Sequence, residues 1–392
     1  MTELRSQKPI YLAEDTISEV ELRELSEWIL AGNRLTKSAE TLAFENEFSA
    51  WIGSKHAIYT NSGSSANLLM IYAMKVAGML RNNKVIAPAV SWVTTVSPLV
   101  QFGFDVSLCD CDSSNLGLDL NHLEHLCKTE HPSLVILVHV LGHANHISEI
   151  KDICDKYGVK LLEDSCEALG SSYAQKNLGT HGVAGSFSFY YGHHISTIEG
   201  GMVVTNDTNL YEVMLSLRSH GWSRDLPTER RNALTLKNDI DSFRNLYTFY
   251  YPGFNLRSTD LQAFIGRSQL KKIDGIIKIR ERNFHIYKQA LPEFFAQESN
   301  TERLSSFAYG TYIENRLGVA ESLKKKEIEC RPLICGNIGR HPFWTDIYGT
   351  SDLPNADKVH DYGIYLPNHH NLSDQDVIYV AETFSEIAIP LK

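Results

Sequence analysis

Residues 186–206 read SFSFYYGHHISTIEGGMVVTN, and this segment gives the strongest indication of the fold. Small and aromatic side chains alternate from Ser186 to Tyr191, a period of two that predicts a half-buried strand. The short apolar run from Met202 to Thr205 predicts another strand. A polar turn lies between them and closes with a glycine pair, which tolerates positive φ and the close approach of another backbone. The segment therefore predicts a strand, a turn and a second strand.

The chain around this segment alternates apolar runs of strand length with helical patterns. Strands that alternate with helices pair through βαβ crossovers, so we expect an α/β fold with a mostly parallel central sheet flanked by helices. Ligands collect at the carboxyl ends of such strands. The predicted strands are AIYT at 57–60, VIAP at 85–88, FDVSLCD at 104–110, LVILVHVLG at 134–142 and VKLLEDS at 159–165, with a clear amphipathic helix at 146–158.

The remaining sequence predicts more helices and a second, smaller domain. Residues 228–251 are polar and weakly periodic, and we interpret them as a loop or insertion. We predict a large domain over residues 1–257 and a small C-terminal α+β domain over 258–392, while the N-terminal helices could pack on either. The supporting patterns are helices within 15–31, 38–52 and 260–282, strands within 306–313 and 329–334, and a closing helix after Ser373.

The composition excludes several classes of function. The 392 residues are 43% hydrophobic and carry a formal net charge of −10. A nucleic-acid surface needs a basic patch, so we expect no nucleic-acid partner. No apolar run approaches the ~18 residues of a membrane span, and Met1 to Pro9 is too polar for a signal peptide. We therefore expect a cytoplasmic protein without membrane contact.

Residues near three predicted strand ends are suited to ligand binding, although each also has an ordinary structural explanation. Gly63, Ser64 and Ser65 follow a strand and begin a helix, where unpaired N–H groups bind anions, but an ordinary turn has the same composition. Trp92 is either a core residue or a flat surface for a planar ligand. Asp164 ends a strand and either caps the next turn or contacts a ligand.

Segments along nearly the whole chain resemble the DegT/DnrJ/EryC1/StrS family of sugar aminotransferases. In this family a lysine in the segment that matches 186–201 binds pyridoxal phosphate (PLP) covalently. The matching residue here is His193, and no lysine occurs between Lys176 and Lys237. This His-His pair is similar to a subgroup of the family, the 3-dehydratases that make 3,6-dideoxysugars. The other resembling segments are SGSSANLLMIYA at 62–73, PAVSWVTT at 88–95, LLEDSCEALGS at 161–171, HGWSRDLP at 220–227, PGFNLR at 252–257 and IECRPLICGN at 328–337.

The resemblance implies the PLP-dependent transferase fold of type I, with the cofactor in the large domain. Asp164 is implied to keep the ring nitrogen protonated, which preserves the ring as an electron sink. Glu167 stands beside the ring, as in the 3-dehydratases, and Trp92 stacks on it. The residues implied to hold the phosphate are Gly63, Ser64, Ser65 and Ser188.

Other positions are implied to contact the substrate or a second subunit. Asn255 matches a residue that reaches the cofactor phosphate of the partner subunit, so we expect a homodimer with shared active sites. Arg331 matches a position at the substrate pocket. Arg224, near His220, is either a substrate contact or a solvated surface charge.

The reaction implied by the resemblance is removal of the C3 oxygen from a GDP-linked 4-keto-6-deoxy sugar, in the synthesis of dideoxysugars such as colitose for surface polysaccharides. L-Glutamate is the implied amino donor, converting PLP to pyridoxamine phosphate (PMP), and ammonia is released with the deoxygenated sugar. His193 is the expected acid and base, because imidazole titrates near pH 6.5. The role of His194 stays open, with orientation of His193 as one alternative.

Two alternatives stay open at this point: an aminotransferase that uses another lysine, and an inactive PLP-fold binding protein. The nucleotide, the sugar and its configuration are also open. The seven cysteines include no Cys-x-x-Cys pair and are expected to be free thiols. Cys109 and Cys111 leave an iron–sulfur cluster as a minor alternative, because one relative in the family carries such a cluster. We expect no metal.

Overall fold

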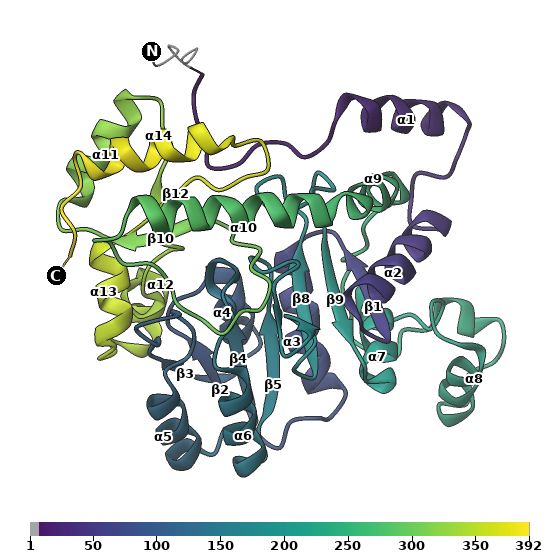
Figure 1. The fold of residues 1–392 in the computed structure, drawn as a ribbon. Helices are drawn as coiled ribbons and strands as arrows, with labels where there is room; N and C mark the ends of the chain where they lie inside the picture. Colours follow the sequence, from purple (N-terminus) through teal and green to yellow (C-terminus); the bar gives the residue numbers. More distant parts are fainter. Residues whose placement is uncertain (1–7, 392) are drawn as a thin grey trace.

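The central element is a seven-stranded sheet in the computed structural model, which describes residues 8–391 (Figure 1). The strand order is β1-β9-β8-β5-β4-β2-β3. Neighbours from β8 to β3 are parallel, and only β9 runs antiparallel to its neighbours. The predicted mostly parallel sheet is therefore confirmed. The bounds are β1 (His56–Thr60), β2 (Lys84–Pro88), β3 (Asp105–Cys109), β4 (Leu134–Val138), β5 (Lys160–Asp164), β8 (Ala184–Ser188) and β9 (Gly201–Thr205).

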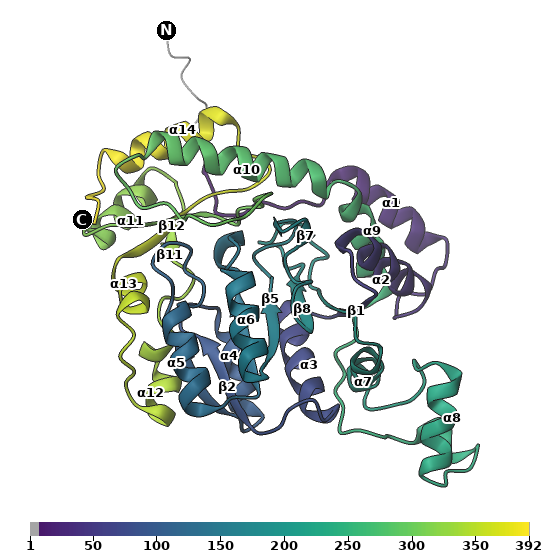
Figure 2. The same ribbon diagram turned by 60° about the horizontal axis from the view of Figure 1, so that its bottom comes forward.

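Helices cover both faces of this sheet (Figure 2). Side chains alternate between faces along a strand, and here both sets are buried. On β2, for example, Val85 packs in one apolar cluster with residues of α3, α4 and α7, while Ile86 packs in another with residues of α5 and α6. The helix bounds are α3 (Gly63–Val76), α4 (Val93–Gln101), α5 (Leu120–Glu130), α6 (Ile147–Tyr157) and α7 (Thr208–Arg218).

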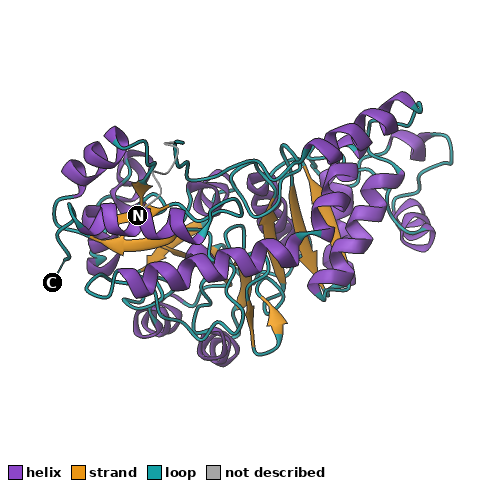
Figure 3. Cartoon of the chain, turned by 45° about the horizontal axis from the view of Figure 1, so that its top comes forward, coloured by secondary structure: helices purple, strands orange, loops and turns teal. Residues whose placement is uncertain are grey.

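A second, three-stranded antiparallel sheet lies apart from the first, with its own apolar core (Figure 3). Ile10 pairs with Ile328, so the start of the described chain joins this smaller unit. The domain boundary after residue 257 remains a prediction. The elements are β10 (Tyr309–Tyr312), β11 (Arg331–Pro332), β12 (Gly363–Leu366), α11 (Arg316–Lys325), α12 (Pro342–Tyr348), α13 (Pro354–Tyr362) and α14 (Asp374–Ser385).

The predicted strand from Ser186 to Tyr191 is placed differently in the structure. The strand is β8, which ends at Ser188 and is buried at every position, because helices and neighbouring strands cover both of its faces. Tyr190 and Tyr191 belong to the turn and are 51% and 41% exposed. The alternation of small and aromatic residues therefore does not mark a half-buried strand.

Two helix predictions also need correction. Part of the expected loop at 228–251 is helical, as α8 (Thr228–Lys237), but none of its residues is buried, so no apolar stripe revealed it. The helix expected from Asp260 to Arg282 is two helices that meet at Lys272. These are α9 (Asp260–Lys271) and α10 (Ile273–Ala290); the predicted N-terminal helices are α1 (Glu19–Leu30) and α2 (Ala39–Ile52).

The remaining elements are short. They are the strand pair β6 (Ser172–Tyr173) and β7 (Lys176–Asn177), and the 3-10 turns η1 (Val140–Gly142), η2 (Arg244–Tyr247) and η3 (Ile338–Arg340). Across residues 8–391, no helix combines the length and the apolar character needed to cross a membrane.

Candidate active site

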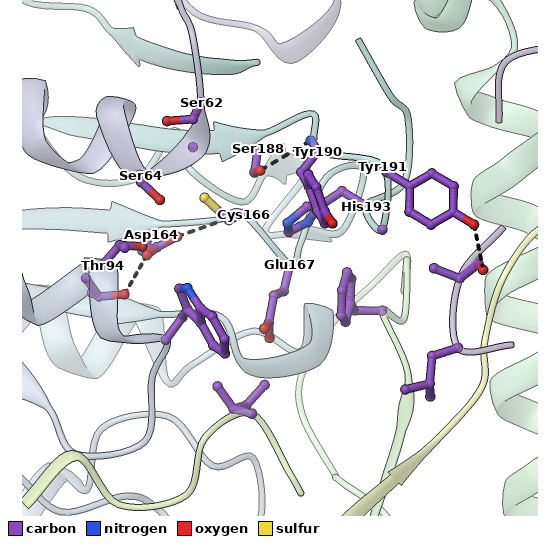
Figure 4. Close-up of a pocket in the computed structure, with 18 of the residues that line it drawn as sticks. Ser62, Ser64, Thr94, Asp164, Cys166, Glu167, Ser188, Tyr190, Tyr191 and His193 are labelled. Atoms are coloured by element: carbon purple, nitrogen blue, oxygen red, sulfur yellow. Dashed lines mark hydrogen bonds between the residues drawn. The ribbon is translucent and has the colours of Figure 1, made fainter. Parts of the chain in front are cut away.

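A cavity of about 640 Å³ opens at the carboxyl ends of β5 and β8, where parallel strands present their last residues side by side. Asp164, Glu167, Ser188 and His193 lie around this cavity (Figure 4). The three-stranded sheet also contributes to the lining through Arg331 of β11. The predicted site residues that line the cavity are Gly63, Ser64, Trp92, Asp164, Glu167, Ser188, His193 and Arg331.

Asp164 is held in a fixed orientation by its neighbours. Asn67 and Thr95 both donate hydrogen bonds to Oδ2, each at 2.7 Å, and the backbone N–H of Cys166 donates to Oδ1 at 3.1 Å. The Ser186 hydroxyl donates to the Asn67 amide oxygen at 2.5 Å, which fixes the amide in turn. Asp164 therefore caps the following turn and also presents a carboxylate to the cavity.

A narrow cradle forms where α3 begins. Ser62 caps the helix by accepting the N–H of Ser65 at 3.0 Å, and Gly63 and Ser64 line the cavity. A Cβ on Gly63 would lie 2.5 Å from the Ser188 Cβ, so only glycine permits this approach. Ser65 does not line the cavity, because its N–H and hydroxyl both face Ser62.

Trp92 is a cavity residue and does not belong to the core. It directly precedes α4, is 55% exposed and lines the cavity, so the core alternative is wrong. Its flat ring is available to a planar ligand on the side of the cavity near Asp164 and Thr95.

His193 and His194 have different surroundings although they are adjacent. His193 lines the cavity, its ring lies 5.2 Å from that of Phe307, and its Nδ1 has no hydrogen-bond partner among the described residues. Burial lowers the pKa of His193 to about 4, while a hydrogen bond to the Cys166 backbone acts in the opposite direction. His194 is fully buried and donates from Nε2 to the Ser305 carbonyl at 2.9 Å. Only His193 is therefore placed to exchange protons with a ligand.

Glu167 is kept protonated by its surroundings at neutral pH. Burial, together with the nearby Asp164 carboxylate, raises the pKa of Glu167 to about 8. The N–H of Leu141 donates to its Oε2 at 2.9 Å. Leu141 adopts a φ of 51°, a conformation that is unfavourable for leucine but directs this N–H to the carboxyl group.

The cavity also contains residues that the sequence analysis did not single out. Asn67, which orients Asp164, is the one amide in the apolar run from Ala66 to Met74 of α3, and that isolated amide was the available signal. Two of the aromatic residues lie just before His193 in the sequence, whereas the other three come from distant parts of the chain and carried no such signal. The aromatic residues are Tyr11, Tyr190, Tyr191, Phe307 and Tyr365.

The other predicted site residues lie away from this cavity. Asn255 is exposed and accepts a hydrogen bond from Arg257 at 3.0 Å, and Arg257 also contacts His220 at 3.2 Å. Arg224 lies 4.3 Å over the ring of Trp222. These residues form a separate group on the segment 219–257, which also carries α8.

The cysteines show no arrangement for a cluster in the described part of the chain. Cys109 and Cys111 are buried, and burial raises the pKa of both thiols. No group of three or more His, Cys, Asp or Glu side chains within residues 8–391 is arranged to hold a metal ion.

The cavity has the features that PLP requires. A helix N-terminus and the close contact of Gly63 with Ser188 suit a phosphate group. Asp164 provides an oriented carboxylate for a ring nitrogen, and Trp92 provides a flat surface. The unpartnered Nδ1 of His193 completes a set of groups that fits this cofactor.

Comparison with known proteins agrees with this geometry. The model of the DegT/DnrJ/EryC1/StrS aminotransferase family matches residues 16–385. The chain belongs to this family. Among members of the DegT/DnrJ/EryC1/StrS family, it is 34% identical over 378 residues to the GDP-4-keto-6-deoxy-D-mannose 3-dehydratase of Yersinia pseudotuberculosis, covering 93% of this chain and 95% of that one. The enzyme of the same name from Escherichia coli O55:H7 is 33% identical over 387 residues, covering 95% and 98%.

Solved structures of family members give the same result. A GDP-4-keto-6-deoxymannose-3-dehydratase with a trapped PLP-glutamate geminal diamine has a TM-score of 0.87 and 30% identity, with 96% of this chain and 100% of that chain covered. Helicobacter pylori PseC, an aminotransferase of pseudoaminic acid biosynthesis, has a TM-score of 0.85 and 27% identity, with 97% and 99% covered. The PLP-dependent fold of type I is therefore shown for this chain.

Proposed function

We propose that this protein is a PLP-dependent 3-dehydratase that removes the C3 oxygen of a GDP-linked 4-keto-6-deoxy sugar, with L-glutamate as amino donor. One observation carries the proposal: among the described residues that line the cavity there is no lysine, and His193 stands in the turn where the family has one. An imidazole there can move protons but cannot hold PLP covalently.

The residues of the chain have distinct tasks in this reaction. PLP, when bound, supplies an electron sink. Asp164 holds a proton on the ring nitrogen, because Asn67 and Thr95 fix its carboxylate in place. His193 Nδ1 accepts a proton from Cα of L-glutamate and delivers it to a different carbon, since the ring is neutral at physiological pH.

The second half of the reaction needs a proton at the departing C3 hydroxyl. His193, once it carries a proton, is the general acid that we assign to this step. Glu167 is held protonated and offers a hydrogen-bond donor on the same side of the cavity. Arg331 supplies a positive charge from the small domain, which suits an anionic cosubstrate such as L-glutamate or a nucleotide-sugar.

The relatives support both the substrate and the cosubstrate. The structure with a trapped PLP-glutamate geminal diamine supports L-glutamate, and another relative was solved with bound GDP-perosamine at a TM-score of 0.88 and 32% identity. GDP-perosamine is a GDP-linked sugar, so it supports guanine as the base recognised here.

We also propose a homodimer whose active sites use residues from both subunits. Asn255, His220 and Arg224 lie outside the cavity of their own chain. Asn255 is exposed, as required of a residue that reaches the cofactor phosphate of a partner subunit.

A product assay tests the function. Purified protein is incubated with PLP, L-glutamate and GDP-4-keto-6-deoxymannose, while ammonia is followed and mass spectrometry identifies the sugar. We expect ammonia and a sugar that has lost one oxygen. An amino sugar would instead establish the aminotransferase. If 2-oxoglutarate forms but the sugar is unchanged, only the proposed substrate is wrong; if neither reaction occurs, an inactive PLP-fold protein is the better description.

A further inference from the structure

Arg280 of α10 is a buried cation without a carboxylate partner. Its side chain is 2% exposed, and no carboxylate of residues 8–391 lies within the 4.0 Å of an ion pair. Its guanidinium donates instead to backbone carbonyls, those of Phe307 at 3.0 Å, Ser306 at 3.4 Å, His193 at 3.5 Å and Asn368. The guanidinium therefore joins the His193 turn to the small domain.

A charge buried in this way is costly, because carbonyl dipoles replace only part of its lost hydration. Burial lowers the pKa of Arg280 to about 9, so the guanidinium still carries its charge at neutral pH. A leucine or methionine would fill the same space without this cost. The position therefore calls for a function that needs the positive charge.

Two pairs of adjacent histidines surround this charge. His193 and His194 precede β9, and His369 and His370 follow β12. The positive charge of Arg280 adds to burial in lowering the pKa of all four rings. Each ring has one nitrogen without a hydrogen-bond partner among the described residues. A ring in this state is ready to accept a proton, but the nearby cation opposes its permanent protonation.

We propose that Arg280 is a positioning residue that fixes the backbone of the His193 turn and opposes protonation of its imidazole, so that the ring is free to accept a proton from the substrate. This assignment rests on the proposed function, in which His193 is the acid and base. Arg280 acts only through His193, because its guanidinium is bound to backbone carbonyls and does not line the cavity.

Charged groups face His193 from several elements. The positive charge of Arg280 opposes the effect of the negative groups on the pKa of His193. Asp164 at the end of β5 raises the pKa of His193, whereas Arg280 lowers it. Around neutral pH Glu167 is protonated. Without Arg280, burial would still lower the pKa of His193, but the effect of Asp164 on the ring would no longer be countered by this positive charge. The titratable groups around His193 come from four parts of the chain. They are Tyr190 and His194 on its own turn, Asp164, Cys166 and Glu167 at and after the end of β5, Arg280 on α10, and His369 and His370 after β12.

Titration of His193 by NMR tests the proposal without relying on activity. Full-length protein with isotope-labelled histidine is titrated before and after PLP is added, and the His193 signal is assigned by its absence in His193→Asn. We compare wild type, Arg280→Gln, Arg280→Lys and the control Arg282→Gln. Arg282 lies two residues along α10 and binds Asp374, Asn283 and the Leu372 carbonyl at the surface.

The expected results separate charge from structure. In Arg280→Gln the pKa of His193 should rise by about 1 unit, the size of effect expected when a nearby charge is removed. In Arg280→Lys, which retains the charge, and in the control Arg282→Gln, the pKa of His193 should stay near the wild-type value. The acidic limb of the pH profile for 2-oxoglutarate formation from L-glutamate should shift by the same amount in the same variant.

Three results would overturn the proposal. The first is a wild-type His193 that titrates at or above 6.5, which decides the matter even if the glutamine variant does not fold. The second is an equal pKa in Arg280→Gln and wild type. The third is a pKa of His193 that rises in Arg280→Lys by as much as is expected for Arg280→Gln. If the titrations behave as expected but wild type does not convert L-glutamate, the proposed function fails while the role of Arg280 stands.

Discussion

The cavity and the segment that carries α8 hold their predicted site residues in opposite ways. Around the cavity, Asp164 is 5% exposed and has three hydrogen-bond donors fixed around it. No residue of α8 is buried, and Leu236 and Phe243 are 82% exposed. In Figures 1 and 2 this helix projects from the body of the molecule. One chain therefore positions the residues at the cofactor end of the site, whereas His220, Arg224 and Asn255 of segment 219–257 lie outside that cavity.

The residues around the cavity and those near α8 therefore meet different structural requirements. A cofactor that must keep its ring fixed needs donors and carboxylates set by a rigid sheet, which is what the ends of β5 and β8 supply. The exposed aromatic and basic residues near α8 are suited to a surface that is completed by a second chain.

Replacement of His193 should have the largest effect. His193→Asn removes the proton acceptor of the cavity, so both 2-oxoglutarate formation and ammonia release should fall by about 10²–10⁴. His194→Asn is the matched control, because His194 lies in the core and binds only the Ser305 carbonyl. Its loss should be at least tenfold smaller. Equal losses in the two variants would contradict the separate roles of this pair.

Shared active sites should be visible in mixed dimers. Asn255→Ala and His193→Asn should each impair activity when alone, since each removes a group from both sites of its homodimer. In a mixed dimer, one site combines an intact His193 with an intact Asn255 from the other chain. Mixing the unfolded variants and refolding them should therefore restore activity above that of either parent. No recovery in a preparation shown to contain mixed dimers would contradict sharing.

Gly63→Ala should disturb the phosphate cradle. The new methyl group would lie 2.5 Å from the Ser188 Cβ, and we expect a loss of about 1–3 kcal/mol in stability together with weaker PLP binding. Gly318→Ala, on α11, is the control, because its Cβ meets no atom within 4 Å. Calorimetry and a PLP titration by absorbance measure both effects. Unchanged PLP affinity in Gly63→Ala would remove this glycine from the binding site.

The smallest effect should come from α8 itself. Leu236→Ser changes a side chain that is 82% exposed, so the free energy of unfolding of the isolated chain should change by less than about 0.5 kcal/mol. Leu162→Ala, in the centre of β5, should cost about 2–5 kcal/mol. Denaturant unfolding measures both. A large loss in Leu236→Ser would show that α8 is buried against another chain in solution.

The sequence predicted the parallel part of the sheet well because β2 and β4 are largely apolar and helices of ordinary length lie between the first strands of the chain. It also placed Asp164 at the end of a strand, whereas Ser188 was found only through the family resemblance, because the predicted strand continued to Tyr191. The helix α8 was missed because it buries nothing, and the break at Lys272 was missed because the apolar spacing continues across it.

Contacts between distant segments were beyond the sequence. Arg280 reads as one charge among several on α10, and only the fold shows it buried against the His193 turn. Ser65 was assigned to the phosphate cradle through the family resemblance, but its N–H is used by the cap of α3. The aromatic wall of Tyr11, Phe307 and Tyr365 is assembled from three parts of the chain.

The central claim is that His193 replaces the lysine of the family and leaves PLP without a covalent bond to the protein. Borohydride reduction of the protein with one equivalent of PLP, followed by peptide mapping, tests it most directly. We expect no modified lysine in wild type and a modified residue 193 in His193→Lys. If a single lysine of the wild-type protein is modified, and L-glutamate prevents that modification, PLP is bound covalently. This result would contradict the role given to His193 and favour the aminotransferase.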